Sequence, residues 1–237
     1  MSDDDWTIPE VALAVDLAIL TVRDGALRIM LVERGEDPYR GMLALPGGFL
    51  FDDTEDVDDA AARELTEETG LHPQGLHLEQ LRTYGTPDRD PRRRVITVCY
   101  LAFVADLPEP TAGGDARAAT WTPARDVLAG ETRVAFDHAR IIADAVERAR
   151  GKLEYTTLAA SFCSSEFTMT DLRRIYEIVW DTRLDARNFH RKLTGVPDFL
   201  VPTGERTTRD GGRPAALYRS GGASLLHPAM LRPGRED

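Results

Sequence analysis

The chain has 237 residues, 42% of them hydrophobic, which is enough for a buried core and excludes a disordered or fibrous protein. The net charge of −11 excludes a uniformly basic nucleic-acid binder, but residues 153–237 carry 12 Lys+Arg against 11 Asp+Glu, so the excess acid lies before them. The acidic start predicts that there is no signal peptide, and the apolar run at Val11–Leu20 is too short to cross a bilayer. With only two cysteines, these features predict a cytoplasmic protein without a membrane partner.

The first part of the chain mixes strand and helix patterns. The apolar run Val11–Val22 and the segment Leu27–Glu33 are typical of two strands joined by a turn at Asp24-Gly25. Early acidic residues and a glycine just past the end predict a helix over Asp56–Thr69. The remaining predicted elements are strands at Gly41–Leu45, His77–Tyr84, Arg94–Ala105 and Ala118–Trp121, and a closing helix at Phe136–Ala149.

The strand-rich pattern stops near Arg150-Gly151-Lys152, where we place a boundary between domains of residues 1–150 and 151–237. Beyond it, apolar residues recur at helical spacing over Met169–Trp180. The later predicted elements are a helix at Asp185–Leu193 and extended segments at Phe199–Val201 and Ala215–Tyr218 around a Gly-rich tip at Arg206–Gly212. The second domain is therefore predicted to run helix, turn, helix and β-hairpin.

Three glutamates share one face of the first predicted helix. Glu64, Glu67 and Glu68 stand at positions i, i+3 and i+4, so their carboxylates repel one another unless something neutralises them. Hard carboxylate oxygens suit Mg²⁺ or Mn²⁺, which in turn bridges to a diphosphate. Arg63 is placed to pair with Glu55 and so tie the helix to the preceding loop. The alternative, a solvated acidic helix face, explains three glutamates alone but not the residues spaced ahead of them.

With these residues the segment resembles the Nudix family, whose motif runs Gly, five residues, Glu, seven residues, Arg-Glu, apolar, any, Glu-Glu, any, Gly, apolar. Seven residues separate Glu55 from Arg63, but six separate Gly48 from Glu55, one more than the family pattern. The resemblance implies an α/β/α sandwich with a mixed sheet that binds a nucleoside diphosphate joined to another group. It also implies that the three helix glutamates are the metal ligands and the catalytic residues of any hydrolysis. The longer loop counts against efficient hydrolysis.

Two further segments of the first domain are candidates for ligand contact. The basic loop Tyr84–Arg94 carries arginines that could clamp phosphates bidentately, and a solvated loop is the equal alternative. The segment Ala135–His138 resembles part of the Nudix proteins that handle ADP-ribose, although a histidine on a helix is more often structural than catalytic. The predicted ligand-binding residues are therefore Gly48, Arg63, Arg89, Arg92 and Arg94.

The short helix of the second domain has a polar face. Phe189 and Leu193, four residues apart, are expected to be buried together, which turns the face with Arg187 outward. Arginine and asparagine bond bidentately to guanine and adenine, although surface helices often carry arginines without reading DNA. A helix before it and an arginine-bearing hairpin after it give the order of a winged helix-turn-helix. The predicted DNA-binding residues are Arg187, Asn188, Arg191, Lys192, Arg213 and Arg219.

The segments Phe167–Glu177, Leu184–Lys192 and Gly212–Arg219, together with the Nudix motif, resemble the Nudix-related transcriptional regulators of NAD metabolism (NrtR). The resemblance covers nearly the whole chain and implies an α+β protein, a Nudix domain followed by a winged helix-turn-helix domain. It implies a homodimeric repressor that binds double-stranded operator DNA near NAD biosynthesis or salvage genes and senses ADP-ribose or a related metabolite.

The competing interpretation is a metal-dependent ADP-ribose pyrophosphatase that yields AMP and ribose 5-phosphate, with the second domain as a dimerisation appendage. A regulator with residual hydrolase activity would combine the two. The sequence leaves open the exact ligand, the operator, the general base, and whether the ligand releases or promotes DNA binding.

Overall fold

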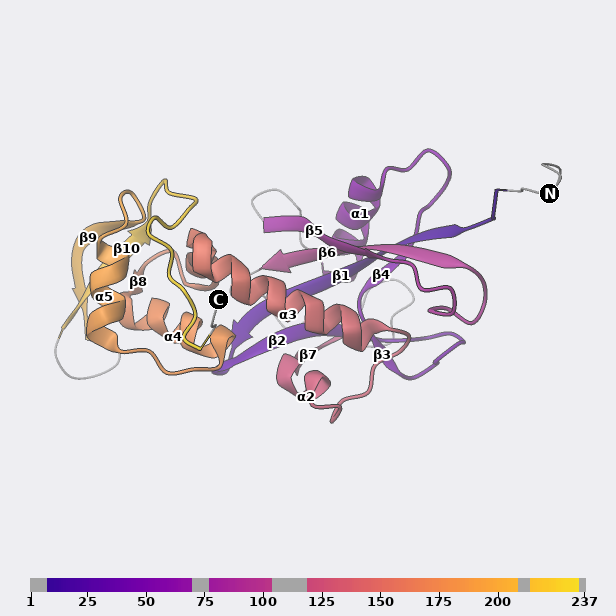
Figure 1. Ribbon diagram of the computed structural model, residues 1–237, viewed down its shortest axis with the longest axis horizontal. Helices are drawn as coiled ribbons and strands as arrows, with labels where there is room; N and C mark the ends of the chain where they lie inside the picture. The colour runs from indigo at the N-terminus through magenta and orange to yellow at the C-terminus, as the bar shows by residue number, and fades with distance from the viewer. Residues whose placement is uncertain (1–7, 70–76, 104–118, 209–213, 235–237) are drawn as a thin grey trace.

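The chain folds as a sheet-based part and a smaller helical part. The long helix α3 (His138–Tyr155) lies along the sheet and extends from it to the helical part (Figure 1). The computed structural model describes residues 8–69, 77–103, 119–208 and 214–234. Within these ranges, no helix combines the length and the apolar character that a membrane span requires.

A mixed sheet forms the first part. Its strands are β1 (Ala12–Arg23), β2 (Ala26–Glu33), β3 (Leu43–Ala44), β4 (Gly47–Phe49), β5 (His77–Tyr84), β6 (Val95–Phe103) and β7 (Ala119–Pro123). The order across the sheet is β3-β2-β1-β6-β5, with β4 paired to β1 and β7 paired to β2. β1 and β6 run parallel, and the other pairs are antiparallel. The predicted mixed sheet is confirmed.

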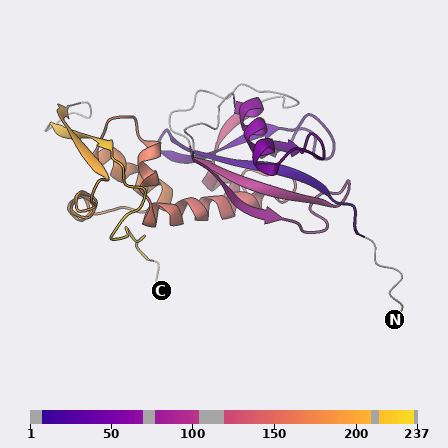
Figure 2. The same cartoon turned by 90° about the horizontal axis from the view of Figure 1, so that it is seen from above.

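Most residues of β1 are apolar, as expected for a strand in a sheet that is covered on both faces. Val15, Leu17 and Ile19 pack in one cluster with residues of α1 (Val57–Thr69). Ala18 and Leu20 point the other way, into a second cluster with residues of α3. Figure 2 shows the two helices on opposite sides of the sheet. The α/β/α sandwich predicted from the motif is therefore confirmed.

The second part is a winged helix-turn-helix, as predicted. It contains the short helix η1 (Thr157–Phe162), β8 (Phe167–Thr168), α4 (Met169–Trp180), α5 (Ala186–Thr194), β9 (Leu200–Thr207) and β10 (Ala215–Ser220). Thr168 and Asp171 form a reciprocal capping box that starts α4. The helix stops at Asp181, which is left-handed with φ of 51°. The Asp185 carboxylate accepts a 2.7 Å bond from the Asn188 N–H and starts α5.

The structure differs from the sequence predictions around α3. The predicted helix Phe136–Ala149 actually begins at His138, because Phe136 has φ of 52°, and it continues to Tyr155. The proposed boundary at residues 150–152 falls inside this helix, so the division into 1–150 and 151–237 stays a prediction. The elements that the sequence did not predict are β4, β8, η1 and the short helix α2 (Ala124–Leu128).

The C-terminal segment, residues 221–234, returns from the wing to the end of α3. The Leu226 N–H donates to the Tyr155 carbonyl at 2.9 Å, and the Met230 N–H donates to the Glu154 carbonyl at 2.8 Å. Leu226 and Met230 are both buried in the cluster that also contains the α3 residues. One apolar core therefore runs from the sheet, past α3, into the winged helix.

Leu153 tests this shared core, because its side chain is fully buried on α3. We expect Leu153→Ala to lower the free energy of unfolding by about 2–5 kcal/mol, through lost apolar burial and a cavity. Leu231→Ala is the matched control, since that side chain is 53% exposed, and it should cost less than about 0.5 kcal/mol. Urea denaturation measures the free energy of unfolding of both variants. Equal losses for the two variants would contradict the placement of α3 in the core.

Candidate ligand pocket and DNA-binding face

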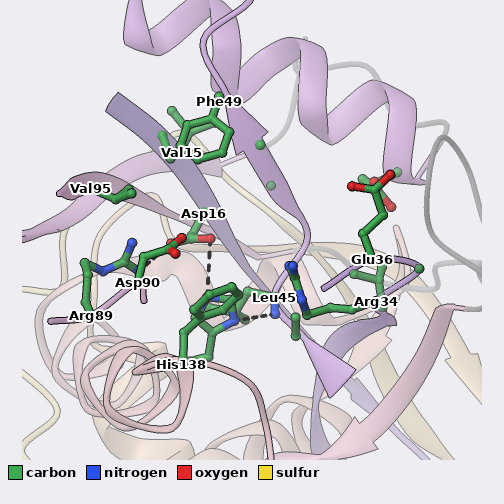
Figure 3. Close-up of a pocket in the computed structure, with 18 of the residues that line it drawn as sticks. Val15, Asp16, Arg34, Glu36, Leu45, Phe49, Arg89, Asp90, Val95 and His138 are labelled. Atoms are coloured by element: carbon green, nitrogen blue, oxygen red, sulfur yellow. Dashed lines mark hydrogen bonds and ion pairs between the residues drawn. The ribbon is translucent and has the colours of Figure 1, made fainter. Parts of the chain in front are cut away.

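A pocket opens where β1, the end of β2 and the start of α3 meet (Figure 3). Four of its lining residues were predicted from the sequence as ligand, metal or catalytic residues: Gly48, Glu68, Arg89 and Arg92. Five further lining residues were not predicted from the sequence: Asp16, Arg34, Glu36, Phe49 and Asp90. These residues come from separate strands and loops that only the sheet order brings together.

Arg89 lies in the wall of the pocket and is held by two carboxylates. Its side chain is 5% exposed, and it bonds to both Asp137 oxygens at 2.9 and 3.2 Å and to Asp16 Oδ2 at 3.3 Å. A buried guanidinium needs such partners, because an unpaired buried charge is costly. Arg89 therefore ties the loop before β6 to β1 and to the start of α3, and most of its donors are already engaged.

His138, the first residue of α3, fixes the other wall. The Leu45 N–H donates to His138 Nδ1 at 2.9 Å, so the ring carries its proton on Nε2, which lies 3.6 Å from Asp16 Oδ1 (Figure 3). Burial lowers the pKa of His138 and keeps the ring neutral. The histidine thereby joins α3 to the residue just before the Gly-rich turn at residues 46–48.

Gly47 of that turn is sterically required, and Gly48 lies close against the Glu64 side chain. Gly47 has φ of 148°, and a Cβ there would lie 2.2 Å from the Val15 carbonyl oxygen. A Cβ on Gly48 would lie 2.3 Å from Glu64 Oε1. The turn is therefore pressed between β1 and the glutamate face of α1, which brings that face to the pocket.

Arg63 organises the glutamate face. Its Nε donates to Glu55 Oε1 at 2.7 Å, which confirms the predicted pair between these residues. Its Nη1 donates to Glu64 Oε1 at 2.8 Å and to Glu67 Oε2 at 3.2 Å. Arg63 therefore offsets only part of the negative charge of these carboxylates, and it does not itself line the pocket.

The three helix glutamates have the oxygen donors that a hard divalent cation prefers. Burial raises the pKa of Glu64, and the adjacent Arg63 opposes that rise. Glu68 is buried and lines the pocket. In the described part of the chain, however, no three acidic, histidine or cysteine side chains converge as metal ligands. The donor chemistry suits a metal, and Glu64 and Glu67 each keep one carboxylate oxygen that Arg63 does not engage, so this assignment stays a prediction.

The polar face of α5 lies as predicted. Phe189 and Leu193 are buried, and the Phe189 ring packs edge-on against Tyr176 at 5.3 Å between centroids. The exposed residues of the helix include Arg187, Asn188 and Arg191, and Lys192 is half-buried. Arg191 Nη2 donates to Asn188 Oδ1 at 2.7 Å, which aligns the two side chains on that face.

The wing is formed by β9 and β10. Arg219, on β10, donates from Nε to Glu166 Oε1 at 2.9 Å, so its charge is partly neutralised. Arg213 lies outside the described residues. DNA-binding roles for both arginines, and for the residues of α5, stay predictions.

Two family models match separate segments of the chain. Residues 12–145 match the NUDIX domain, and residues 159–220 match the NrtR DNA-binding winged helix domain. The chain is 32% identical to the ADPR responsive transcriptional repressor NtrR of Acinetobacter baylyi, over 89% of this chain and 82% of the relative. It is 40% identical to the ADP-ribose pyrophosphatase of Methanocaldococcus jannaschii over 49% of this chain and 64% of that protein.

One solved structure is similar to both parts of the chain, and another is similar to the first part. The Shewanella oneidensis NrtR complexed with a 27mer DNA matches with a TM-score of 0.74 and 33% identity, over 88% of this chain and 93% of that one. The NUDIX domain of the same NrtR complexed with ADP ribose matches with a TM-score of 0.54 and 34% identity, over 60% of this chain and 90% of that one.

The neutral state of His138 predicts a pH dependence of stability. An unfolded histidine binds a proton below pH 6.5, whereas the buried ring, with its lowered pKa, does not. This contribution to stability is fully present above pH 6.5 and is lost as the pH falls toward the lower folded pKa, at up to about 1.4 kcal/mol per pH unit. His138→Asn keeps an acceptor for the Leu45 N–H but cannot titrate.

We therefore expect the stability difference between the wild type and His138→Asn to narrow as the pH falls below about 6.5. The charged groups that face the ring are Asp16, Arg34, Arg89 and Asp137, and both proteins carry them, so their contributions cancel when the two proteins are unfolded in urea in parallel. A difference that is constant with pH would show that the histidine is not held neutral.

Proposed function

We propose that this chain, which belongs to the NrtR family of Nudix-related transcriptional regulators, represses genes of NAD biosynthesis or salvage by binding their operators. The observation that carries the proposal is the exposed face of α5, with Arg187, Asn188 and Arg191, next to a β-hairpin wing. These side chains suit base edges in a major groove. A relative of the same two-domain fold has been solved on DNA.

ADP-ribose, or a related NAD metabolite, is the proposed ligand of the pocket. The Acinetobacter relative is ADPR responsive, and the Shewanella NUDIX domain was solved with ADP ribose. A ligand shifts the DNA-binding equilibrium only if it binds one arrangement of the protein better than the other. We propose a cytoplasmic homodimer, in which two winged domains meet two operator half-sites.

Helix α3 supports such coupling, since it contacts both functional parts. At its start, His138 and the adjacent Phe136 line the pocket. Near its end, the Trp180 indole N–H donates to the Arg150 carbonyl at 3.0 Å, and Arg150 Nε donates to the Val179 carbonyl at 3.0 Å. A movement of α3 on ligand binding would therefore reposition α4, the first helix of the DNA-binding motif.

The test is capture of genomic DNA fragments by the purified protein, followed by elution with ADP-ribose. We expect specific recovery of fragments that flank NAD genes. Arg191→Ala should weaken binding to such a fragment about 5- to 150-fold and relax its sequence preference, because a bidentate base contact is lost. Arg125→Ala is the control, because it removes an 84% exposed arginine from α2.

Failure to recover specific DNA at moderate salt would overturn the proposal that the protein is a repressor. Specific recovery with unchanged affinity for Arg191→Ala would keep the repressor but remove the base-reading role of that residue. Recovery without elution by ADP-ribose would reject this ligand as the releasing signal.

A second function, metal-dependent ADP-ribose hydrolysis, is favoured by two observations. All three helix glutamates are retained, and the Methanocaldococcus relative is an ADP-ribose pyrophosphatase. We propose that Glu64, Glu67 and Glu68 would hold Mg²⁺ or Mn²⁺, which when bound would polarise the diphosphate and activate water. The products would be AMP and ribose 5-phosphate.

Glu68→Gln tests this activity. With Mg²⁺ present, we expect the variant to lose ADP-ribose turnover by about 100-fold or more, because a carboxylate at the reacting diphosphate is removed. Glu131→Gln, at an exposed acid away from the pocket, is the matched control and should keep turnover. Turnover that survives Glu68→Gln would show that the carboxylate face is not the active site.

A further inference from the structure

Arg34 occupies the pocket in a different manner from Arg89. Its backbone is fixed, because its N–H donates to the Met42 carbonyl at 3.0 Å and its carbonyl accepts from the Gly41 N–H at 2.9 Å. Its Nε donates to the Pro38 carbonyl at 2.9 Å, so only the two terminal nitrogens remain for other partners. Figure 3 shows this side chain reaching from the end of β2 toward His138 and Leu45.

The Arg34 guanidinium is stacked on an aromatic ring rather than paired with an acid. Its central carbon lies 4.6 Å from the centroid of the Phe136 ring, within cation–π range. In the described ranges of the chain, Arg34 has no carboxylate within ion-pair distance. The planar group is therefore held in place while its terminal N–H donors stay available to a ligand.

Arg92 lies beside the same ring. Its guanidinium carbon is 5.9 Å from the Phe136 centroid and 5.5 Å from the Phe49 centroid. Asp90 accepts from Arg92 Nε at 3.0 Å and from Nη2 at 2.7 Å. Two guanidinium groups thus lie near one aromatic ring in the pocket wall, and among the described residues Asp90 is the carboxylate bonded to one of them.

Arg34 and Arg92 are two positive charges in one pocket wall. Burial, and next the charge of Arg92, lower the pKa of Arg34, and the carboxylates of Asp90, Glu36 and Asp16 oppose that shift. A phosphate oxygen would restore a counter-charge, and guanidinium groups bind phosphate bidentately. Arg89 cannot serve equally, because Asp16 and Asp137 already hold it. Arg94 is not among the residues that line the pocket.

We propose that Arg34, supported by Phe136 and Arg92, is the residue that recognises the diphosphate of the ligand. The inference rests on the proposed nucleoside-diphosphate ligand and adds how the pocket selects it. It shifts the main anion contact from the arginine-rich loop before β6 to the end of β2. Because guanidinium groups make the contact, binding through them requires no divalent metal.

The test is isothermal titration with ADP-ribose, ADP and adenosine in the presence of EDTA, so that no metal contributes. We expect Arg34→Ala to weaken the binding of ADP-ribose and of ADP about 10- to 100-fold, and to leave the binding of adenosine unchanged. The affinity of Arg34→Lys for ADP-ribose should lie between those of the wild type and Arg34→Ala, because lysine keeps the charge but lacks the planar guanidinium. Arg40→Ala is the control in the same loop, because that side chain is 54% exposed and does not line the pocket.

Unchanged affinity of Arg34→Ala for ADP-ribose would overturn the inference while leaving the proposed ligand intact. Equal weakening of adenosine would also overturn it, because Arg34 would then shape the pocket rather than read phosphate. If the wild type binds no ADP-ribose, the proposed ligand is wrong, and inorganic pyrophosphate becomes the probe. Binding of pyrophosphate that depends on Arg34 would still support recognition of a diphosphate by this residue, and absence of pyrophosphate binding would overturn it.

Discussion

The hydrogen bond from the Leu45 N–H to His138 Nδ1 links the sheet to helix α3 at the point where the pocket forms. It fixes the start of α3 against the Gly-rich turn at residues 46–48, and this turn also packs against Glu64 of α1. From the same start, α3 extends 18 residues, about 27 Å, to its contacts with the winged helix. The position of one buried histidine thus sets the geometry of the pocket and the reference point of the DNA-binding part.

The arginines of the pocket fall into two physical classes. Arg89 is buried with two carboxylates, and a buried cation in that state contributes to the wall and is hard to recruit for a ligand. Arg34 is only partly buried and is stacked on Phe136, so the structure has fixed its orientation but not satisfied its charge. Sequence alone does not separate these classes, because both are arginines in polar loops beside strands.

What the sequence predicted well are features with local patterns. The spacing of Arg63 and the glutamates, the apolar run of β1 and the amphipathic faces of α4 and α5 each depend on neighbours within one element. The pocket residues Asp16, Arg34 and Asp90 were missed because they meet only through the sheet order. The left-handed Phe136 and the C-terminal segment were missed for a similar reason, since tertiary contacts hold both in place.

Ligand binding and hydrolysis place different demands on the same pocket. A sensor responds to the free concentration of its ligand, so rapid turnover in the pocket would remove the signal that the protein reads. Arg63 bonds to Glu55, Glu64 and Glu67, and the carboxylates of Glu64 and Glu67 each keep a second oxygen through which a divalent cation could bind. Recognition of a diphosphate at Arg34 would use guanidinium donors instead of these carboxylates. Binding and hydrolysis would then depend on different side chains, so a Nudix domain could act as a sensor while it keeps the glutamates of a hydrolase.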